Sequence, residues 1–149
     1  MSRYPDNRGA VDKLLENPRV WRGRSFAQGT PGLATGYAEL DRHLPGGGWP
    51  QQALTEILTE HYGIGELRLL MPALARLGAG DGSAECDEPG WIAWVAPPFL
   101  PYPPALEQWG VDLARVLVVR PGSNGDMLWS AEQALASGTC AAVLLWPEH

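Results

Sequence analysis

The sequence contains almost no lysine and little cysteine, and it has no long apolar run. Its only lysine is Lys13, and its two cysteines, Cys86 and Cys140, form no CxxC pair and share the chain with only three histidines. A zinc site is therefore not expected, and the cysteine usage is typical of a reducing compartment. No apolar stretch reaches the roughly 18 to 20 residues that span a bilayer, and the N-terminus is too polar for a signal peptide. These absences predict a cytoplasmic protein with no membrane contact.

Charge is divided unevenly along the chain. Residues 1–24 hold six of the 11 basic side chains and three of the 17 acidic ones, so the rest of the chain carries five basic and 14 acidic side chains. An acidic body repels DNA phosphates, so strong DNA binding by that part of the chain is not expected. Weak or indirect DNA binding by the basic head stays open beside a simply solvated arm, and a protein partner is the better expectation.

The chain divides into an arm and a core. Residues 1–34 contain one short amphipathic helix pattern, AVDKLLEN, which Pro18 ends, and then a segment rich in Gly, Ser and Gln. This composition is typical of an N-terminal helical arm followed by a linker. Residues 35–149 have the length and the apolar content of one globular domain.

Four apolar runs in the core predict buried strands. They are ALTEIL (53–58), WIAWVA (91–96), RVLVV (115–119) and AAVLLW (141–146). Three of them are nearly continuous in apolar residues, and such runs suit a sheet that is covered on both faces. Helical patterns lie between the runs, which predicts an α/β fold with a mostly parallel sheet flanked by helices.

The helical patterns carry their own boundary signals. The first, over residues 64–77, contains Pro72, which predicts a bend because proline removes one backbone donor. The pattern over residues 127–135 is expected to begin near Asp126. Three glycines are expected to follow the ends of helices, namely Gly78, Gly110 and Gly138.

The turn between the first predicted strand and the first helix has the outline of a phosphate-binding loop. In G-x-x-x-x-G-K-[ST], backbone N–H groups and a lysine hold the phosphates, and a hydroxyl binds magnesium. Here TEHYGIGEL supplies Gly63 and Gly65, but Ile64 or Glu66 stands where lysine is required, depending on which glycine ends the loop, and no Ser or Thr follows. Glu60 and Glu66 also bring negative charge toward the phosphate position.

A second part of the nucleotide machinery is missing as well. Magnesium requires a carboxylate at the end of a neighbouring strand, whereas AAVLLWPEH ends in Trp146 and Pro147, and Glu148 comes two residues late. Arg68 lies about one turn into the helix and is no replica of the lysine. We therefore predict a degenerate P-loop, no nucleotide or metal cofactor, no catalytic residue and no enzymatic activity. A weak ATPase that uses Arg68 is the alternative.

Several long strings carry a family resemblance. TGYAELDRHLPGGGWPQQALTEIL (35–58) is similar to the segment that leads into the P-loop of the RecA recombinase core, and residues 110–121 and 131–146 resemble its later strand and helix segments. Other strings resemble the ImuA family, RecA-like accessory proteins of damage-induced translesion synthesis. They are VWRGR, LPGGGWP, GIGELRLLMPALARL, WVAPPFLPYPPAL and WSAEQALASG. The resemblance to the recombinase core covers residues 35–149.

The resemblance implies a RecA-like core that works through other proteins. The implied partners are an ImuB-like Y-family polymerase homologue, an error-prone replicative-type polymerase and RecA-like proteins. The SulA family of cell-division inhibitors, which bind FtsZ, shares the same degenerate core and is the alternative. ImuA-like proteins continue beyond the fourth predicted strand, so the resemblance implies that this chain is truncated at its C-terminus.

Four residues are candidates for partner contacts. Trp21 lies in the arm with Arg22 and Arg24 beside it, and Trp49 lies in the LPGGGWP turn. A large ring in a linker usually docks on its own core or on another chain. The arm resembles in position the recombinase segment that packs on the next subunit, so self-association is one expectation. The core tryptophans are instead expected to be buried or to cover the sheet: Trp91, Trp94, Trp109, Trp129 and Trp146.

Overall fold

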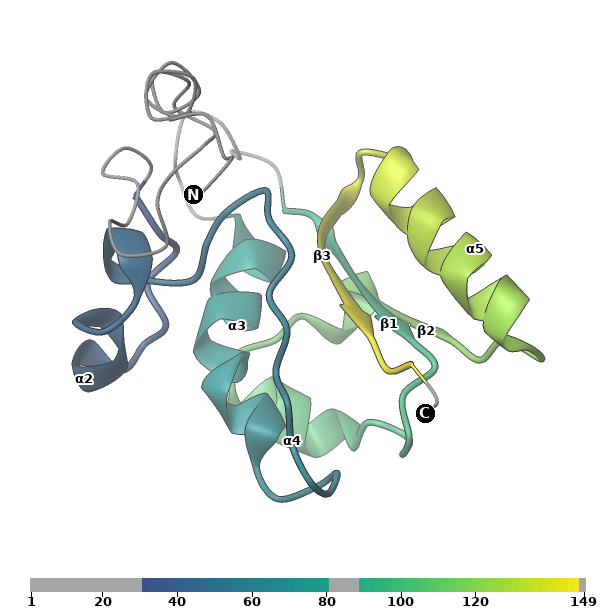
Figure 1. Cartoon of the computed structure of the whole chain (residues 1–149), viewed down its shortest axis with the longest axis horizontal. Coiled ribbons are helices and arrows are strands. Elements are labelled where there is room, and N and C mark those ends of the chain that lie inside the picture. Colours follow the sequence, from purple (N-terminus) through teal and green to yellow (C-terminus); the bar gives the residue numbers. More distant parts are fainter. Residues whose placement is uncertain (1–30, 81–88, 148–149) are drawn as a thin grey trace, which may run out of the picture. The chain divides into compact units, whose positions relative to one another are not determined.

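The computed structural model describes residues 31–80 and 89–147 of the chain (Figure 1). The chain forms two compact units, of which the first ends at Glu56 and the second begins at Ile57. The arm residues Trp21, Arg22 and Arg24 lie outside the described residues, so their role in partner contacts stays a prediction. None of the described helices combines the length and the apolar character of a bilayer span.

The described part of the first unit contains a short paired segment. Leu33 and Trp49 form an antiparallel bridge in which the backbone N–H of each donates to the carbonyl of the other, at 2.8 and 2.7 Å. Between them, η1 (Pro45–Gly47) turns the chain back. Gly48 is buried here, and a Cβ at this position would collide with the carbonyl of Leu33. The LPGGGWP string therefore owes one of its glycines to a close backbone approach.

Helix α2 (Ala38–Asp41) is a single turn held by polar contacts. Asp41 Oδ1 accepts a hydrogen bond from the backbone N–H of Thr35 at 2.9 Å. The Thr35 hydroxyl donates to the Tyr37 carbonyl at 3.2 Å and accepts from the Tyr37 N–H at 3.0 Å. Thr35 is completely buried, and these bonds satisfy its hydroxyl. The threonine and the aspartate of TGYAELD thus close one turn of the chain.

The predicted strand at residues 53–58 is wrong. The segment has no assigned strand and no ladder partner in the described part of the chain, and 95% of Leu54 is exposed. Its pattern differs from the other three runs in one physical respect, because it carries Glu56 in its middle. A strand buried on both faces would desolvate that carboxylate without a partner, which opposes the gain from its few apolar side chains.

The other three runs form the predicted parallel sheet of the second unit. The strands are β1 (Trp91–Val95), β2 (Val116–Val119) and β3 (Cys140–Leu145), in the order β2-β1-β3. Both pairings of β1 are parallel, with Ala93 opposite Leu117 on one side and Val143 on the other. The predicted α/β class with a parallel sheet is therefore confirmed for three strands.

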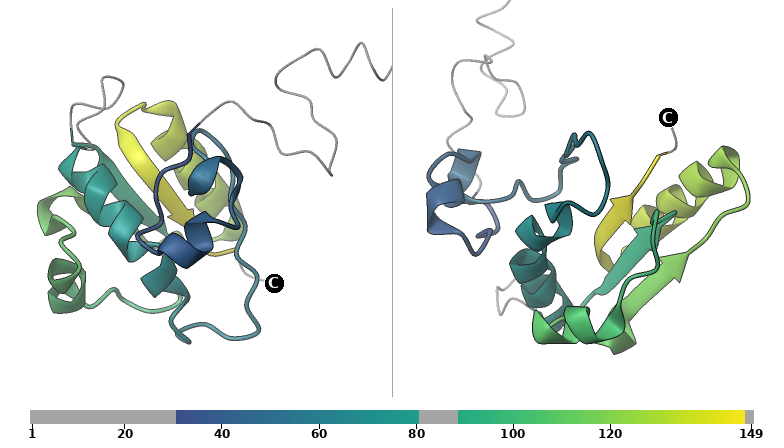
Figure 2. Two further views of the ribbon diagram at one scale, coloured as in Figure 1. Left: turned by 90° about the vertical axis from the view of Figure 1, so that its left-hand side faces the viewer. Right: turned by 90° about the horizontal axis from the view of Figure 1, so that it is seen from below.

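Helices cover both faces of the sheet (Figure 1). Ile92 and Trp94 point to one face, where they join buried side chains of α3 (Met71–Ala79) and α4 (Pro103–Gln108). Helix α5 (Asn124–Ala136) lies on the opposite face, which Figure 2 also shows, and buries Met127 and Ala131. The core is therefore built on β1, the central strand, whose last four residues are completely or almost completely buried.

The first helix of this unit differs from its prediction at both ends. Residues Glu66–Leu69 form the 3₁₀ helix η2, and α3 begins only at Met71, so Pro72 lies in a first helical turn and not at a bend. A proline is tolerated there because the first N–H groups of a helix have no partner to lose. Gly78 is not the cap that we predict. It lies inside α3, where a Cβ would come within 3.3 Å of Ile92, and Gly80 follows the helix instead.

Two other predicted boundaries are confirmed and one is shifted. Gly110 and Gly138 have positive φ, as the residue after a helix often requires. Helix α5 begins three residues earlier than its apolar pattern, because Ser123 is its N-cap and Asp126 lies in its first turn. Trp94 is buried as expected, whereas Trp91, Trp109 and Trp129 are exposed.

Candidate functional site

The turn between Tyr62 and Glu66 is the candidate site, because the sequence predicts a degenerate phosphate-binding loop there. Gly63 and Gly65 have φ of +82° and +109°, in the region where glycine carries no steric cost. The nearest atoms to a Cβ at these two positions would be 3.7 and 3.8 Å away, which is ordinary contact. The two glycines are therefore required by backbone conformation and not by lack of space.

The Glu66 side chain fills this turn. Its Oε1 accepts a hydrogen bond from the Gly63 N–H at 2.9 Å, and its Oε2 accepts one from the Gly65 N–H at 3.1 Å. Both carboxylate oxygens are thus bound by backbone donors of the turn that precedes their own residue. These are the groups that would point at a phosphate in a nucleotide-binding loop.

These hydrogen bonds hold Glu66 in its charged form. The bond from the Gly63 N–H is the largest cause, and it lowers the pKa of the Glu66 carboxyl below its ordinary value of 4.5, while partial burial acts in the opposite direction. The turn therefore keeps a negative charge at neutral pH. An incoming phosphate would meet that charge and would also have to displace it from both donors.

Apolar side chains surround the turn. Tyr62 and Ile64 are exposed on the turn itself, and the Phe99 ring lies within 3.7 Å of the position that a Cβ on Gly63 would occupy. The side-chain stem of Arg68 lies beside Gly65, 3.8 Å from the equivalent Cβ position. Sequence reasoning identified Gly63, Gly65 and Glu66, but it missed Phe99, which comes from the loop after β1 and is distant along the chain.

The sequence predicts no magnesium ligand directly after the strand that became β3, and Trp146 and Pro147 follow that strand in the structure. Strand β3 ends at Leu145, and Trp146 packs on Trp94 with ring centroids 5.5 Å apart. Glu148 lies outside the described residues. Within residues 31–80 and 89–147, no three His, Cys, Asp or Glu side chains are grouped closely enough to hold a metal ion.

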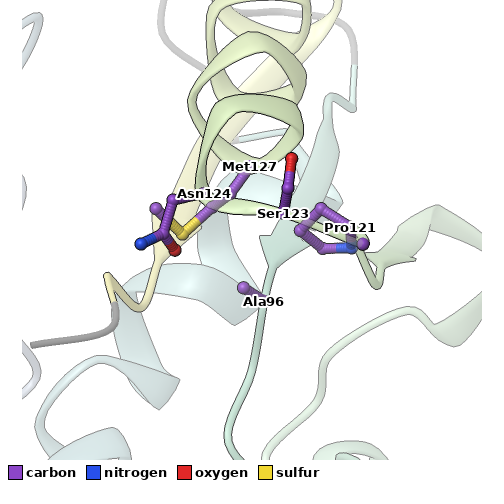
Figure 3. Close-up of a pocket in the computed structure, with 6 residues that line it drawn as sticks. Ala96, Pro121, Ser123, Asn124 and Met127 are labelled. Atoms are coloured by element: carbon purple, nitrogen blue, oxygen red, sulfur yellow. The ribbon is translucent and has the colours of Figure 1, made fainter.

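A hollow lies where β1 and β2 end and α5 begins (Figure 3). It is lined by Ala96, Pro121, Gly122, Ser123, Asn124 and Met127 and has a volume of about 70 Å³. Ligand pockets for small molecules have volumes of roughly 300 to 1,000 Å³, so this hollow is too small for a nucleotide. Its helix N-terminus is also occupied, since the Ser123 hydroxyl accepts from the Asp126 N–H at 3.2 Å and donates to the Asp126 carboxylate at 2.7 Å.

Trp49, the remaining predicted contact residue, lies in the first unit and is half-buried. Its backbone is fixed by the bridge to Leu33, and its indole N–H is buried without a hydrogen-bond partner among the described residues. This is a second feature that the sequence alone did not reveal. A scan against protein-family models and a search of curated proteins found no match to this chain.

Proposed function

We propose that this chain is a non-catalytic, RecA-like accessory protein of damage-induced translesion synthesis. Its proposed partner is an ImuB-like Y-family polymerase homologue, in the cytoplasm. The observation that carries the non-catalytic part is the Glu66 carboxylate, which accepts from the N–H groups of Gly63 and Gly65 and so uses the donors that a nucleotide would need. The parallel sheet with helices on both faces is compatible with a RecA-like core.

Charge and surface support action through protein contacts. The turn between Tyr62 and Glu66 offers one carboxylate and no lysine, since Lys13 is the only lysine of the chain. Exposed aromatic and aliphatic side chains lie on this turn and on the loop beside it. Such surfaces are typical of protein interfaces, in which aromatic side chains supply much of the binding energy.

The proposal is tested by two titrations of the full chain. Thermal unfolding with ATP and magnesium at millimolar concentration should show no increase in Tm, because a ligand that binds the folded state must stabilise it. Calorimetric titration with the purified Y-family polymerase homologue should show saturable binding. A rise in Tm with ATP would favour the weak ATPase, and binding to purified FtsZ in place of the polymerase homologue would favour the cell-division inhibitor.

A further inference from the structure

Two loops of the second unit bring large apolar side chains together at one place. The first is the turn that contains Gly63, and the second is the proline-rich loop between β1 and α4. They are neighbours, because the Phe99 ring comes within 3.7 Å of the Cβ position at Gly63. Five side chains on these loops define what we call the turn patch: Tyr62, Ile64, Phe99, Leu100 and Tyr102.

The turn patch is exposed throughout. The exposed fraction of its members runs from 43% for Tyr62 to 69% for Leu100 and Tyr102. Single exposed apolar residues are normal on protein surfaces and need no explanation, but several of them on two neighbouring loops, three of them aromatic, are typical of an interaction site. Rings that protrude this far require a concave surface on whatever covers them.

The second loop is held in place at both ends. At its start, the Ala96 N–H donates to the Val119 carbonyl of β2 at 2.9 Å, and Pro97 is buried. At its end, the Tyr102 carbonyl accepts from the N–H groups of Ala105 and Leu106 at 3.0 and 3.3 Å, and Leu106 belongs to the hydrophobic core. Prolines fix φ along the loop. Docking would therefore cost little conformational entropy, since the side chains are already presented on an ordered backbone.

The surroundings of the turn patch are acidic. Residues 57–68 and 97–108 contain three carboxylates and one guanidinium, namely Glu60, Glu66, Glu107 and Arg68. Glu60 and Glu107 are exposed, and Glu66 is half-buried. Attraction across the rim of an interface requires the opposite sign on the other side. A second copy of this described surface would bring the same acidic excess, so a different protein fits better.

We infer that the turn patch is the docking surface for the partner of the proposed function, and that this partner presents an apolar groove rimmed by arginine or lysine side chains. The inference rests on the proposed function and assigns the surface that performs it. The turn whose backbone N–H groups are occupied by the Glu66 carboxylate thereby binds protein and not phosphate.

The test is a calorimetric titration of the full chain against the purified Y-family polymerase homologue. Phe99→Ala and Leu100→Ala should each weaken binding by about 5-fold or more, because truncating a central apolar contact typically costs at least about 1 kcal/mol. Trp129→Ala and Leu128→Ala are the matched controls, since α5 exposes these side chains to a similar degree. They should leave the affinity unchanged. Thermal unfolding of each variant confirms that it is folded.

A charge variant tests whether basic side chains rim the groove of the partner. Glu60→Gln should weaken binding and reduce its dependence on salt, because it removes one rim charge. If the wild-type chain binds but Phe99→Ala binds equally well, the turn patch is not the surface, although the proposed function stands. If the wild-type chain does not bind at all, the proposed function and the assignment of the turn patch are both wrong. Self-association that Phe99→Ala abolishes would identify a second copy as the occupant and overturn the choice of partner.

Discussion

The second unit contains two helix starts that each involve a carboxylate, and they use it differently. Before η2, the Glu66 carboxylate itself accepts from the N–H groups of Gly63 and Gly65. At α5, the Ser123 hydroxyl accepts the backbone N–H of Asp126, and the Asp126 carboxylate accepts only from that hydroxyl among the bonds found. The η2 start is therefore capped by a charged carboxylate. The α5 start is capped by a neutral hydroxyl, which itself donates to a carboxylate.

The difference shows which local feature each start depends on. The α5 start needs a residue of ordinary backbone conformation with a short hydroxyl, and any chain with serine at this position can form it. The Glu66 start needs two glycines with positive φ, because only then do both N–H groups converge on one carboxylate. The α5 start therefore depends on a side chain, and the η2 start depends on the backbone.

The largest expected effect comes from breaking that backbone requirement. Gly65→Val should destabilise the second unit by about 2 to 3 kcal/mol, because a β-branched residue is strained at a φ of +109°. Gly125→Ala is the matched control on α5. It removes a glycine from a helix, where the nearest atom to the new Cβ is 3.7 Å away, and should stabilise by up to about 1 kcal/mol. Urea unfolding measures both, and equal effects of the two changes would contradict the comparison.

The next effect comes from breaking the neutral cap. Ser123→Ala should cost about 1 kcal/mol, because the Asp126 N–H loses its acceptor and the Asp126 carboxylate loses its donor. Ser130→Ala is the control within the same helix. Its hydroxyl donates to the Asp126 carbonyl at 2.6 Å from an exposed position, so alanine should be neutral or slightly stabilising there. The change in the urea midpoint should separate the two variants, and a silent Ser123→Ala would show that the cap contributes nothing.

Sequence reasoning identified the turn but not what fills it. The absence of lysine, hydroxyl and magnesium ligand is visible in TEHYGIGEL and AAVLLWPEH, because each is a missing residue type. That Glu66 folds back onto Gly63 and Gly65 depends on torsion angles that no spacing rule specifies. The neighbouring Phe99 depends on tertiary packing between loops 36 residues apart, which local periodicity does not report.

The strands show the same limit. The runs that became β1, β2 and β3 carry no charged side chain between their bounds, whereas the failed run at 53–58 carries Glu56. Three of the four runs are nearly continuous in apolar residues, and apolar content still led to a strand prediction for the fourth. What separated them was the cost of burying one carboxylate between two covered faces, which has to be weighed explicitly. The exposure of Trp129 has a different cause, because it lies on the side of α5 opposite Met127 and Ala131.

A smaller effect should come from Glu66→Gln, and it should depend on pH. The folded-state pKa of Glu66 is lowered, so its contribution to stability is fully present above about pH 4.5 and is lost as the pH falls through the folded-state value. We expect a loss below about 1 kcal/mol at pH 7, since Glu66 is only half-buried and solvent screens the charge. Unfolding free energies measured from pH 7 to pH 3 should therefore converge for the two proteins at low pH. A constant difference would assign the effect to shape and not to charge.

The smallest effect should come from Glu66→Ala, which tests whether the Glu66 carboxylate keeps phosphate away from the backbone N–H groups of the turn. Glu66→Ala leaves Gly63 and Gly65 in place but frees both N–H groups, which can then donate to an anion at the start of η2. Inorganic phosphate should raise the stability of this variant by about 0.4 kcal/mol at a concentration equal to its Kd, and it should leave the wild-type chain unchanged. Glu132→Ala on α5, an exposed carboxylate away from any backbone donor among the bonds found, is the control for general charge removal. A gain in stability with phosphate for Glu132→Ala as large as that for Glu66→Ala would mean that net charge alone governs the response, and that the turn is no cradle.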